Sequence, residues 1–426
     1  MLKRSEGMRN MCAYDVAVVG GGTAGVAAAV GAARAGAKTI LIERSPYLGG
    51  QATNSGVTAF CGFYTCGDEK KKVVAGVGDM VLKELQSLGE NTDYGITAAG
   101  NATIKFHPEY LKCALDNLLE HNKVDYLLHA QVISAKVEKD KIQSIDCVDD
   151  EGIFTIKATV YIDATGDANL SALSGAETMW GDESGKVQAA TLALKIDNIS
   201  LDADISPQAV EKAILQAKKA GIPYLTKEKG FIIQRSPGEL GYVLLPSVIP
   251  AGLSAKDATE AEKNMRRQAH AYFKAFRKYM PGMERIGLVE TGPSIGYRET
   301  RKIVGKEMLY QESILLGLKT EEGIGHGCWI PEIHKDVNKM GQYHEFKSGD
   351  YYDIKLSVLR SVNRENLYGA GRNISADEIA FASSRVMGTC FVTGHGAGVA
   401  AAMQALHGQI DIIEIRNELR KQGAMV

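Results

Sequence analysis

The sequence predicts an α/β protein in which a Rossmann-like nucleotide-binding domain is interrupted by a mixed α+β domain. Three observations lead to this prediction. A β-rich run, residues 14–19, precedes closely spaced glycines and an alanine-rich helix expected over residues 24–35. A second strand and glycine turn come at residues 366–377. Between them, after Asn169, the small residues give way to loops, short strands and one long amphipathic helix, so the second domain is expected as an insertion.

The first unit has the residue types that a dinucleotide requires. Gly20, Gly22 and Gly25 supply the GxGxxG spacing between strand and helix. The first glycine permits a tight turn, the second lets backbone approach a pyrophosphate, and the third allows close helix packing. The next strand, residues 39–42, ends in Glu43, where a carboxylate would accept hydrogen bonds from a ribose. These features predict a dinucleotide-binding unit, and the alternative is a glycine-rich turn in an ordinary α/β domain.

Composition and charge limit the classes of function. The formal net charge is −2 and the basic residues form no long block, so a nucleic-acid partner is not expected. Seven cysteines, an odd number, suit a reducing compartment better than a disulfide framework. Cysteines and histidines do not recur in pairs at ligand spacing, so we expect no metal site.

An apolar run over residues 16–33 imitates a secretory signal or a membrane span. A strand–turn–helix explains it better, because glycines interrupt it at Gly20, Gly21, Gly22, Gly25 and Gly31. Elsewhere no window offers the roughly 18 unbroken apolar residues that a spanning helix needs. We therefore expect a soluble, cytoplasmic chain without a membrane partner.

Three later stretches extend the dinucleotide pattern. The first, S-P-Y-L-G-G-Q-A-T at residues 45–53, has a glycine pair that would let backbone run close to a flat ligand. The second is a hairpin-like series that ends in D-A-T-G-D at residues 163–167; its strands are expected at residues 132–137, 142–148 and 153–162. The third, N-L-Y-G-A-G-R-N-I-S-A-D at residues 366–377, is expected as strand then turn, before a Gly/Ala-rich helix.

In this order and spacing the chain resembles the FAD-dependent oxidoreductases with a glutathione-reductase type of FAD domain. Two further motifs carry the resemblance, and it spans nearly the whole chain, from Tyr14 to about Gln404. A central G-x-R-E-x-R motif falls on Gly296, Arg298, Glu299 and Arg301, and an R-x-x-G-T segment falls on Arg385, Gly388 and Thr389.

The resemblance implies an FAD-binding domain formed by residues 13–170 and 355–426, and a substrate domain formed by residues 171–354. FAD is expected to be noncovalent, because no histidine lies between Glu43 and Cys66, where some related flavoproteins attach it. The C-terminal helix would present its N-terminus to the flavin pyrimidine, where negative charge grows on reduction. The expected cofactor-binding residues are Gly20, Gly22, Gly25, Glu43, Arg44, Gly49, Gly50, Gln51, Val132, Ala164, Thr165, Gly166, Gly371, Arg372, Arg385 and Val386.

The pair Cys61 and Cys66 raises the alternative of a redox-active dithiol. A pyridine-nucleotide disulfide reductase needs a second dinucleotide fingerprint, and the sequence has none. In such enzymes the first cysteine follows the paired glycines almost directly, whereas Cys61 lies eleven residues after Gly50. We therefore expect two reduced cysteines in a loop that lines the active site, although the sequence cannot report a lowered thiol pKa.

Chemistry beside a flavin requires a proton acceptor or donor and cations that hold an anionic group. Arg298 and Arg301 are candidates from the central motif, and a structural salt bridge with Glu299 or Glu290 is the alternative. His334 is the better-matched candidate base, because related proteins tend to carry W-x-x-D-x-H where this chain has Trp329, Glu332 and His334. His326 is the second histidine candidate, and a core or surface role is the alternative for both.

The sequence as a whole predicts hydride transfer between a small organic substrate and noncovalent FAD. A disulfide reductase using Cys61 and Cys66 is one alternative. A flavin-bound redox sensor or binding protein is another, although the chain has no spare segment for a partner module. Homo-oligomerisation is possible, and the substrate, the direction of the reaction and the electron acceptor are not determined by the sequence.

Overall fold

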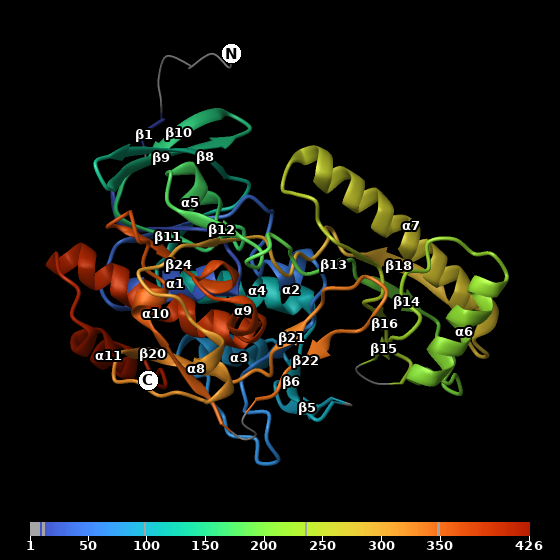
Figure 1. Cartoon of the computed structure of the whole chain (residues 1–426). Helices are drawn as coiled ribbons and strands as arrows, with labels where there is room; N and C mark the ends of the chain where they lie inside the picture. Colours follow the sequence, from blue (N-terminus) through green and yellow to red (C-terminus); the bar gives the residue numbers. More distant parts are fainter. Residues whose placement is uncertain (1–8, 11–12, 98, 235–236, 347–349) are drawn as a thin grey trace.

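A parallel five-stranded sheet lies at the centre of the larger lobe in the computed structural model, which describes residues 9–10, 13–97, 99–234, 237–346 and 350–426 (Figure 1). The strand order is β24 (Leu367–Gly369), β11 (Ala158–Asp163), β2 (Tyr14–Val19), β3 (Thr39–Ile42) and β7 (Asp125–Leu127). The predicted strands 14–19 and 39–42 are confirmed. Their apolar side chains are buried on both faces, as expected for a parallel sheet covered by helices.

Two helices rich in small residues pack tightly on this sheet. They are α1 (Thr23–Arg34), within one residue of its predicted bounds, and α10 (Met387–His407). An added Cβ at Gly394 would overlap the carbonyl oxygen of Ala24, and one at Gly398 would overlap that of Ala28. The glycines of α10 therefore let its backbone lie directly against α1. The same core includes α3 (Val77–Ser87), α4 (Pro108–His121) and α11 (Ile412–Lys421).

A sheet that is antiparallel except for the parallel pair of β1 and β10 lies above the parallel one (Figure 1). Its order is β1 (Arg9–Asn10), β10 (Gly152–Ile156), β9 (Lys141–Asp149) and β8 (Gln131–Glu138). The single strand predicted over residues 153–162 is wrong, because the chain breaks at Lys157 into β10 and β11, which belong to different sheets. The Lys157 carbonyl instead accepts a hydrogen bond from the N–H of Tyr14 at 3.0 Å, where the second sheet begins.

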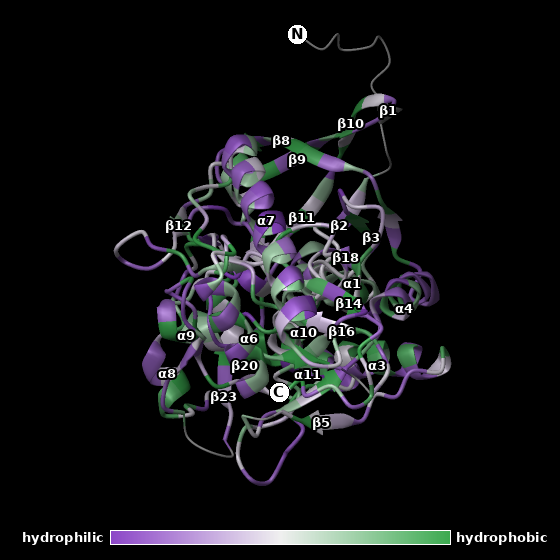
Figure 2. Cartoon of the chain, turned by 90° about the vertical axis from the view of Figure 1, so that its right-hand side faces the viewer, coloured by the Kyte–Doolittle hydropathy of each residue, from purple (hydrophilic) through white to green (hydrophobic). Residues whose placement is uncertain are grey.

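The second lobe, residues 190–291, has its own hydrophobic core and lies to the right in Figure 1. Its sheet is β15 (Ile232–Ile233), β16 (Gly241–Val243), β14 (Leu194–Asp197) and β18 (Gly287–Thr291), packed with α6 (Pro207–Lys219) and α7 (Ala255–Tyr279). The helix predicted at 261–280 begins earlier, because Ser254 caps it by accepting a hydrogen bond from the Asp257 N–H at 3.1 Å. Figure 2 shows the many hydrophilic residues along α7, and its apolar stripe is buried in the core.

Short elements connect the two lobes and complete the larger one. Leu309, Ile324 and Tyr352 pack into the core of the parallel sheet, so residues after the second lobe return to the first, and the domain bounds given above stay a prediction. These elements are α2 (Gln51–Asn54), β4 (Ala59–Cys61), β5 (Tyr94–Ile96), β6 (Ala102–Lys105), α5 (Asn169–Leu173), β12 (Thr178–Trp180), β13 (Ala190–Thr191), β17 (Ser247–Val248), β19 (Arg301–Ile303), α8 (Gln311–Leu315), β20 (Gly323–Gly327), β21 (Glu332–Ile333), β22 (Gln342–Tyr343), β23 (Tyr352–Lys355), η1 (Leu356–Val358), η2 (Gly371–Asn373) and α9 (Glu378–Ser384).

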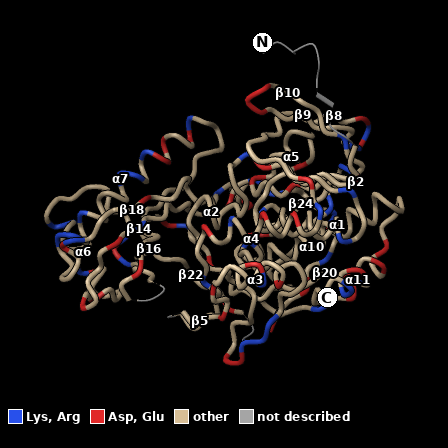
Figure 3. Tube along the Cα trace, turned by 180° about the vertical axis from the view of Figure 1, so that it is seen from behind, with Lys and Arg blue, Asp and Glu red and all other residues tan. Residues whose placement is uncertain are grey.

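Acidic and basic residues are interspersed over both lobes (Figure 3). Across the described residues, no single helix is both long and apolar enough to cross a membrane. The pair α9 and α10 would qualify jointly by length and composition, but it is bent by 92°.

Candidate functional site

The predicted glycine fingerprint forms a close backbone contact at the carboxyl end of β2. Gly20 has φ of +103°, and an added Cβ there would lie 2.5 Å from the Ala164 carbonyl oxygen. A Cβ at Gly25 would overlap the carbonyl oxygen of Gly20. Gly22 caps α1, and among the described residues no side chain satisfies the N–H groups of this helix end. These N–H groups and the helix dipole form an anion site of the kind that binds a pyrophosphate.

The second glycine pair lies beside the first. Gly49 donates its N–H to the Gly21 carbonyl at 2.8 Å, and an added Cβ at Gly50 would lie 2.9 Å from Cα of Gly22. Gly50 has φ of +56° and precedes α2, which begins at Gln51. The two glycine segments therefore lie in direct backbone contact, which a side chain at Gly50 would disrupt.

Glu43 ends β3 beside these glycines. Its carboxylate accepts hydrogen bonds from the N–H groups of Gly21 at 2.6 Å and Ser45 at 2.7 Å. Each oxygen retains a further lone pair for a ribose hydroxyl. The Ala130 N–H donates to the Glu43 carbonyl at 3.0 Å, which places the strand that contains Val132 next to this acid. Arg44 is exposed.

The predicted A-T-G and G-A-G-R turns are joined by an ion pair. Arg372 donates to Asp167 at 2.6 Å. Burial raises the pKa of Asp167, but Arg372, the Thr300 hydroxyl and Arg44 together bring this pKa below its usual value. Gly166, with φ of +76°, lies so close to Arg372 that an added Cβ would be 2.9 Å from the guanidinium. The structure thus brings Ala164, Thr165 and Gly166 together with Gly371 and Arg372, as the sequence predicts.

The N-terminus of α10 fits a polar ligand. Val386 is the N-cap, and within the described residues no side chain caps this helix. Three polar atoms here are buried without a partner in the described part of the chain: Ser384 Oγ, Arg385 Nε and Thr389 Oγ1. Leaving such an atom unpaired costs about 1–3 kcal/mol, so a ligand with acceptors and donors would stabilise this segment. The need for a ligand with both acceptors and donors fits the pyrimidine end of a flavin.

Arg298 lies where the two lobes meet. It donates from Nη1 to the Ala189 carbonyl and to Thr191 Oγ1, both at 2.6 Å. The acids proposed as alternative partners pair elsewhere: Glu299 with Lys302 at 3.0 Å, and Glu290 with Lys195. The guanidinium charge is therefore held by neutral oxygens. Burial, then the like charge of Arg385, lowers the pKa of Arg298 to about 10.

His334 is anchored on the same residue as Arg298. The Ala189 N–H donates to the His334 carbonyl at 2.8 Å. The His334 ring places Nε2 at 3.2 Å from Glu332, and its Nδ1 is buried with no partner among the described residues. Burial, then Arg298, lowers the pKa of His334 to about 4. Although burial opposes it, the hydrogen bond to His334 and the charges of His334, Arg385 and Arg298 lower the pKa of Glu332 to about 2.

The structure does not bring the other two candidates into this group. Arg301 donates to the Asp167 carbonyl at 3.1 Å and to Asn169 at 2.7 Å, so it fastens β19 to the A-T-G turn. His326, on β20, pairs with Asp353 at 2.7 Å, and the centroid of its ring lies 4.4 Å from that of Tyr351 at a tilt of 53°. These contacts fit positioning or structural roles, and the assignment of either residue to the chemistry stays a prediction.

Lys227 joins the site although the sequence does not single it out. It is only 4 % exposed, and Arg298 and Glu332 both act on its charge. In the sequence L-T-K-E-K-G a lysine is indistinguishable from an exposed loop residue. A local signal for its role is missing because its position is fixed by Tyr272 of α7, which is distant in the sequence.

The cysteines lie at the edge of the site as protonated thiols. Burial, then the charge of Glu332, raises the pKa of Cys61 to about 12. Burial also raises the pKa of Cys66, whose S–H donates to the Cys328 carbonyl at 3.2 Å. Cys328 in turn donates to the Gly62 carbonyl at 3.3 Å. A third cysteine thus joins the predicted pair, and all three are free.

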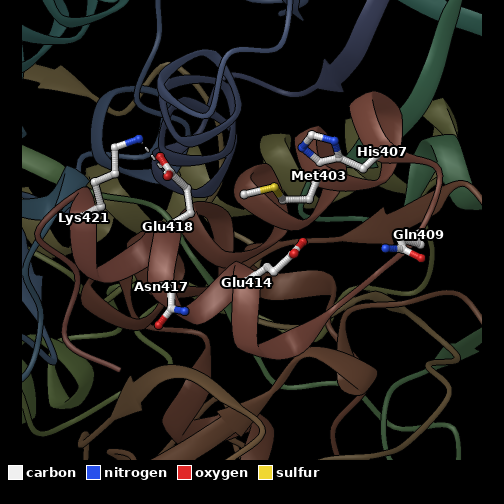
Figure 4. A pocket seen from close by; sticks show the side chains of 7 residues that line it. All are labelled: Met403, His407, Gln409, Glu414, Asn417, Glu418 and Lys421. Atoms are coloured by element: carbon white, nitrogen blue, oxygen red, sulfur yellow. Dashed lines mark hydrogen bonds and ion pairs between the residues drawn. The ribbon is translucent and has the colours of Figure 1, made fainter.

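A surface hollow lies at the opposite end of α10. It is lined by Met403, His407, Gln409, Glu414, Asn417, Glu418 and Lys421 (Figure 4). A 21-residue helix is about 30 Å long, so this open hollow is separate from the site at Val386. Within the described part of the chain, no group of three or more His, Cys, Asp or Glu could hold a metal ion.

Fold and site together define a dinucleotide-binding α/β protein. The family described as FAD dependent oxidoreductase matches residues 15–421. Because this match covers nearly the whole sequence, the chain belongs to the FAD-dependent oxidoreductase family, and its cofactor is FAD. The residues described above fit this cofactor. A search of curated proteins gives no match.

Solved structures resemble this chain at low sequence identity, and the likeness to GidA supports the fold. GidA from Aquifex aeolicus is 13 % identical, with a TM-score of 0.52, over 94 % of this chain and 65 % of GidA. A geranylgeranyl bacteriochlorophyll reductase-like protein from Thermoplasma acidophilum is 13 % identical, with a TM-score of 0.49, over 97 % and 84 %. OxyS anhydrotetracycline hydroxylase from Streptomyces rimosus is 10 % identical, with a TM-score of 0.45, over 96 % and 66 %. The chain thus spans about two thirds of the length of GidA and OxyS.

Proposed function

We propose that the protein oxidises or reduces a small organic substrate by hydride transfer at noncovalently bound FAD. The observation that carries this proposal is the group formed by Arg298, His334 and Glu332 at the junction of the lobes, near Arg385 at the N-terminus of α10. It combines a cation held by neutral oxygens with a buried, unpartnered imidazole nitrogen. A small-molecule partner and a cytoplasmic location are part of the proposal, supported by the balanced charge.

The FAD domain is proposed to be of the glutathione-reductase type. Support comes from the parallel sheet β7-β3-β2-β11-β24 combined with the antiparallel sheet of β8, β9 and β10. The glycine segments at Gly22 and Gly49 would hold the pyrophosphate, and Glu43 the ribose. The α10 N-terminus, with Arg385 and Thr389, would hold the pyrimidine edge and stabilise negative charge there.

The residues of the site have complementary roles in this reaction. FAD, when bound, supplies the two-electron acceptor or donor. His334 accepts at Nδ1 the proton of a substrate hydroxyl or amine during oxidation, and returns it in the reverse direction. Glu332 accepts the Nε2–H, which fixes the tautomer and stabilises the charged ring after proton uptake. Arg298 orients the substrate through its remaining N–H groups.

The disulfide-reductase alternative has less support. The raised pKa values of Cys61 and Cys66 keep both thiols protonated at neutral pH, whereas the thiolate is the reactive form. The redox-sensor alternative has no observation in its favour beyond the cluster of thiols with Cys328. Neither alternative accounts for the pair of His334 with Glu332.

Anaerobic bleaching of the flavin tests the proposal. Purified protein would be mixed without oxygen with 2-hydroxy acids, amino acids, sugars and glycosides, and the flavin absorbance followed. We expect one class to bleach the flavin and acid precipitation to release it. Bleaching only by dithiols, abolished in Cys61→Ser, would replace the proposal with the disulfide-reductase mechanism, and yellow colour retained in the precipitate would contradict noncovalent binding.

A further inference from the structure

The loop that holds Lys227 is rigidly fixed inside the second lobe. The Tyr272 hydroxyl accepts a hydrogen bond from the Lys227 N–H at 2.7 Å and donates to the Lys227 carbonyl at 3.0 Å. The neighbouring Thr226 hydroxyl donates to Gln268 at 2.9 Å. Both partners belong to α7, so this helix sets the position from which the lysine side chain starts. A lysine in an ordinary loop would extend into water instead.

Lys227 is buried with no direct partner for its ammonium in the described part of the chain, and Glu332 is the carboxylate whose charge acts on it. Throughout the described residues, no carboxylate or carbonyl pairs with its Nζ, although the side chain is only 4 % exposed. Burial, followed by the positive charge of Arg298, lowers the pKa of Lys227 to about 8. Lysines are almost never buried unless paired, and an isolated buried charge is costly. A ligand that brings negative charge would offset this cost.

Positive charge exceeds negative charge around this position. Gln268, the partner of Thr226, also accepts from the Ser247 N–H at 2.8 Å, and Ser247 pairs with Thr191, to which Arg298 donates. Lys227, Arg298 and Arg385 each interact electrostatically with Glu332. The one carboxylate that they share is Glu332, and its further partner His334 is neutral because its pKa is lowered to about 4. Arg385 lies at the α10 N-terminus, where the proposed flavin site is. Lys227 and Arg298 therefore remain for another anion.

We propose that Lys227 and Arg298 form an anion-binding pair at the junction of the lobes, and that the substrate carries a carboxylate or a similarly compact anion bound by this pair. This inference rests on the proposed function and specifies its substrate class. The Arg298 guanidinium can donate two parallel hydrogen bonds to a carboxylate, and the Lys227 ammonium adds a third donor from the other lobe. Neutral analogues are rejected because they bring no negative charge to offset the burial of the two cations.

The first test measures the binding of acetate and benzoate by the oxidised holoenzyme, at constant ionic strength, through changes in the flavin absorption spectrum. The neutral isosteres acetamide and benzamide are the comparison. We expect at least one carboxylate to bind at least tenfold more tightly than its amide, which corresponds to about 1.4 kcal/mol. Equal binding of acid and amide would overturn the inference.

Matched lysine variants assign the binding to Lys227. Lys227→Met should weaken carboxylate binding at least tenfold, and Lys227→Arg should restore part of it. Lys229→Met is the control, because Lys229 lies two residues away on the same loop with a side chain that is 70 % exposed, and it should bind as wild type does. Weakening by both methionine variants alike, or by neither, would contradict an anion site at Lys227.

Melting temperature gives a second readout that does not depend on activity. The carboxylate should raise the melting temperature of the wild-type holoenzyme but not that of Lys227→Met. Without anion, Lys227→Met should melt no lower than wild type, because a buried unpaired charge has been removed. If Lys227→Met fails to fold, the buried ammonium is structural and the inference is wrong.

The anion site and the proposed oxidoreductase function can fail separately. If only neutral compounds bleach the flavin, the anion site is refuted and the oxidoreductase function stands. If carboxylates bind but no compound bleaches the flavin, the oxidoreductase function is refuted and the anion site stands.

Discussion

The imidazole Nε2 of His334 lies 3.2 Å from Oε1 of Glu332. Because the pKa of His334 is lowered to about 4, chiefly by burial and then by Arg298, the ring is neutral near pH 7 and Nε2 carries the proton that Glu332 accepts. Nδ1, which has no partner among the described residues, is then the nitrogen with a free lone pair. The carboxylate thus determines which side of the ring can take up a proton.

His334→Gln should therefore lower the rate of flavin reduction by the cognate substrate by about 10²–10⁴-fold, the usual contribution of a general base. In wild type the rate should fall as the pH drops toward the lowered pKa, since the protonated ring cannot accept a proton, and this acid limb should vanish in the variant. Anaerobic stopped-flow reduction between pH 4 and 8 measures both effects.

The second histidine provides the contrast. His326→Gln removes the pair with Asp353, so it should lower the melting temperature and change the reduction rate by less than about threefold. The assignment of the base would be reversed if His326→Gln abolished reduction while His334→Gln left it intact.

Arg298→Lys should slow reduction by the cognate substrate by more than tenfold, with FAD content unchanged. Lysine keeps the charge but cannot reproduce the planar fork, and hydrogen bonds to charged groups contribute roughly 1.5–3 kcal/mol. Single-turnover reduction and melting temperature are measured on the same preparation. A lowered melting temperature with normal kinetics would mean that Arg298 only holds Ala189 and Thr191 in place.

The double variant Cys61→Ser, Cys66→Ser should keep at least a tenth of the wild-type reduction rate, a barrier increase of no more than about 1.4 kcal/mol. The reason is that burial holds both thiols protonated, which excludes them as nucleophiles at neutral pH. Flavin content is checked by absorbance. A loss of several orders of magnitude with FAD still bound would restore the dithiol mechanism.

Gly398→Ala should destabilise the protein by about 1–3 kcal/mol, because its Cβ would overlap the Ala28 carbonyl and backbone cannot rotate away. Chemical denaturation gives the free energy of unfolding. Gly95→Ala is the control, since an added Cβ meets nothing within 4 Å there. Equal effects of the two substitutions would show that the α1–α10 contact is less tight than described.

Acid should destabilise the protein through His395. This buried ring donates a hydrogen bond from Nε2 to the side-chain oxygen of Gln422 at 2.9 Å, and burial lowers its pKa from 6.5 to about 4. Because the folded-state pKa is depressed, the stabilising effect is present above pH 6.5 and is lost as the pH falls from 6.5 toward 4, by up to about 2–3 kcal/mol. Urea unfolding at pH 7 and pH 5 measures this loss.

His395→Gln should reduce the difference in unfolding free energy between these two pH values. His270→Gln is the matched control, because His270 is exposed on α7, and it should keep the wild-type difference. A His395 variant as acid-sensitive as wild type would place the titrating group elsewhere, and His334 would be the next residue to test.

Local patterns determined the nucleotide lobe from the sequence alone. Short-range spacing predicts strands β2 and β3, helix α1, the glycine turns and Glu43. Each glycine is required by contacts with residues that are near it in the sequence or in a neighbouring segment of the sheet. The break at Lys157 was missed for the complementary reason: residues 153–162 read as one β-rich run, and the separation into β10 and β11 depends on which sheet each half joins.

Only the tertiary structure decided how the candidate side chains are grouped. Arg298 and His334 are 36 positions apart, yet both are fixed by Ala189, whereas Arg301 and His326, close to them in the sequence, make their contacts elsewhere. Lys227 has no local signature, because the residues that fix its loop, Tyr272 and Gln268 of α7, are distant in the sequence. A sequence pattern reports the chemistry that a residue can perform, but the desolvation and neighbouring charge that shift its pKa come from distant segments, and these exist only in the folded chain.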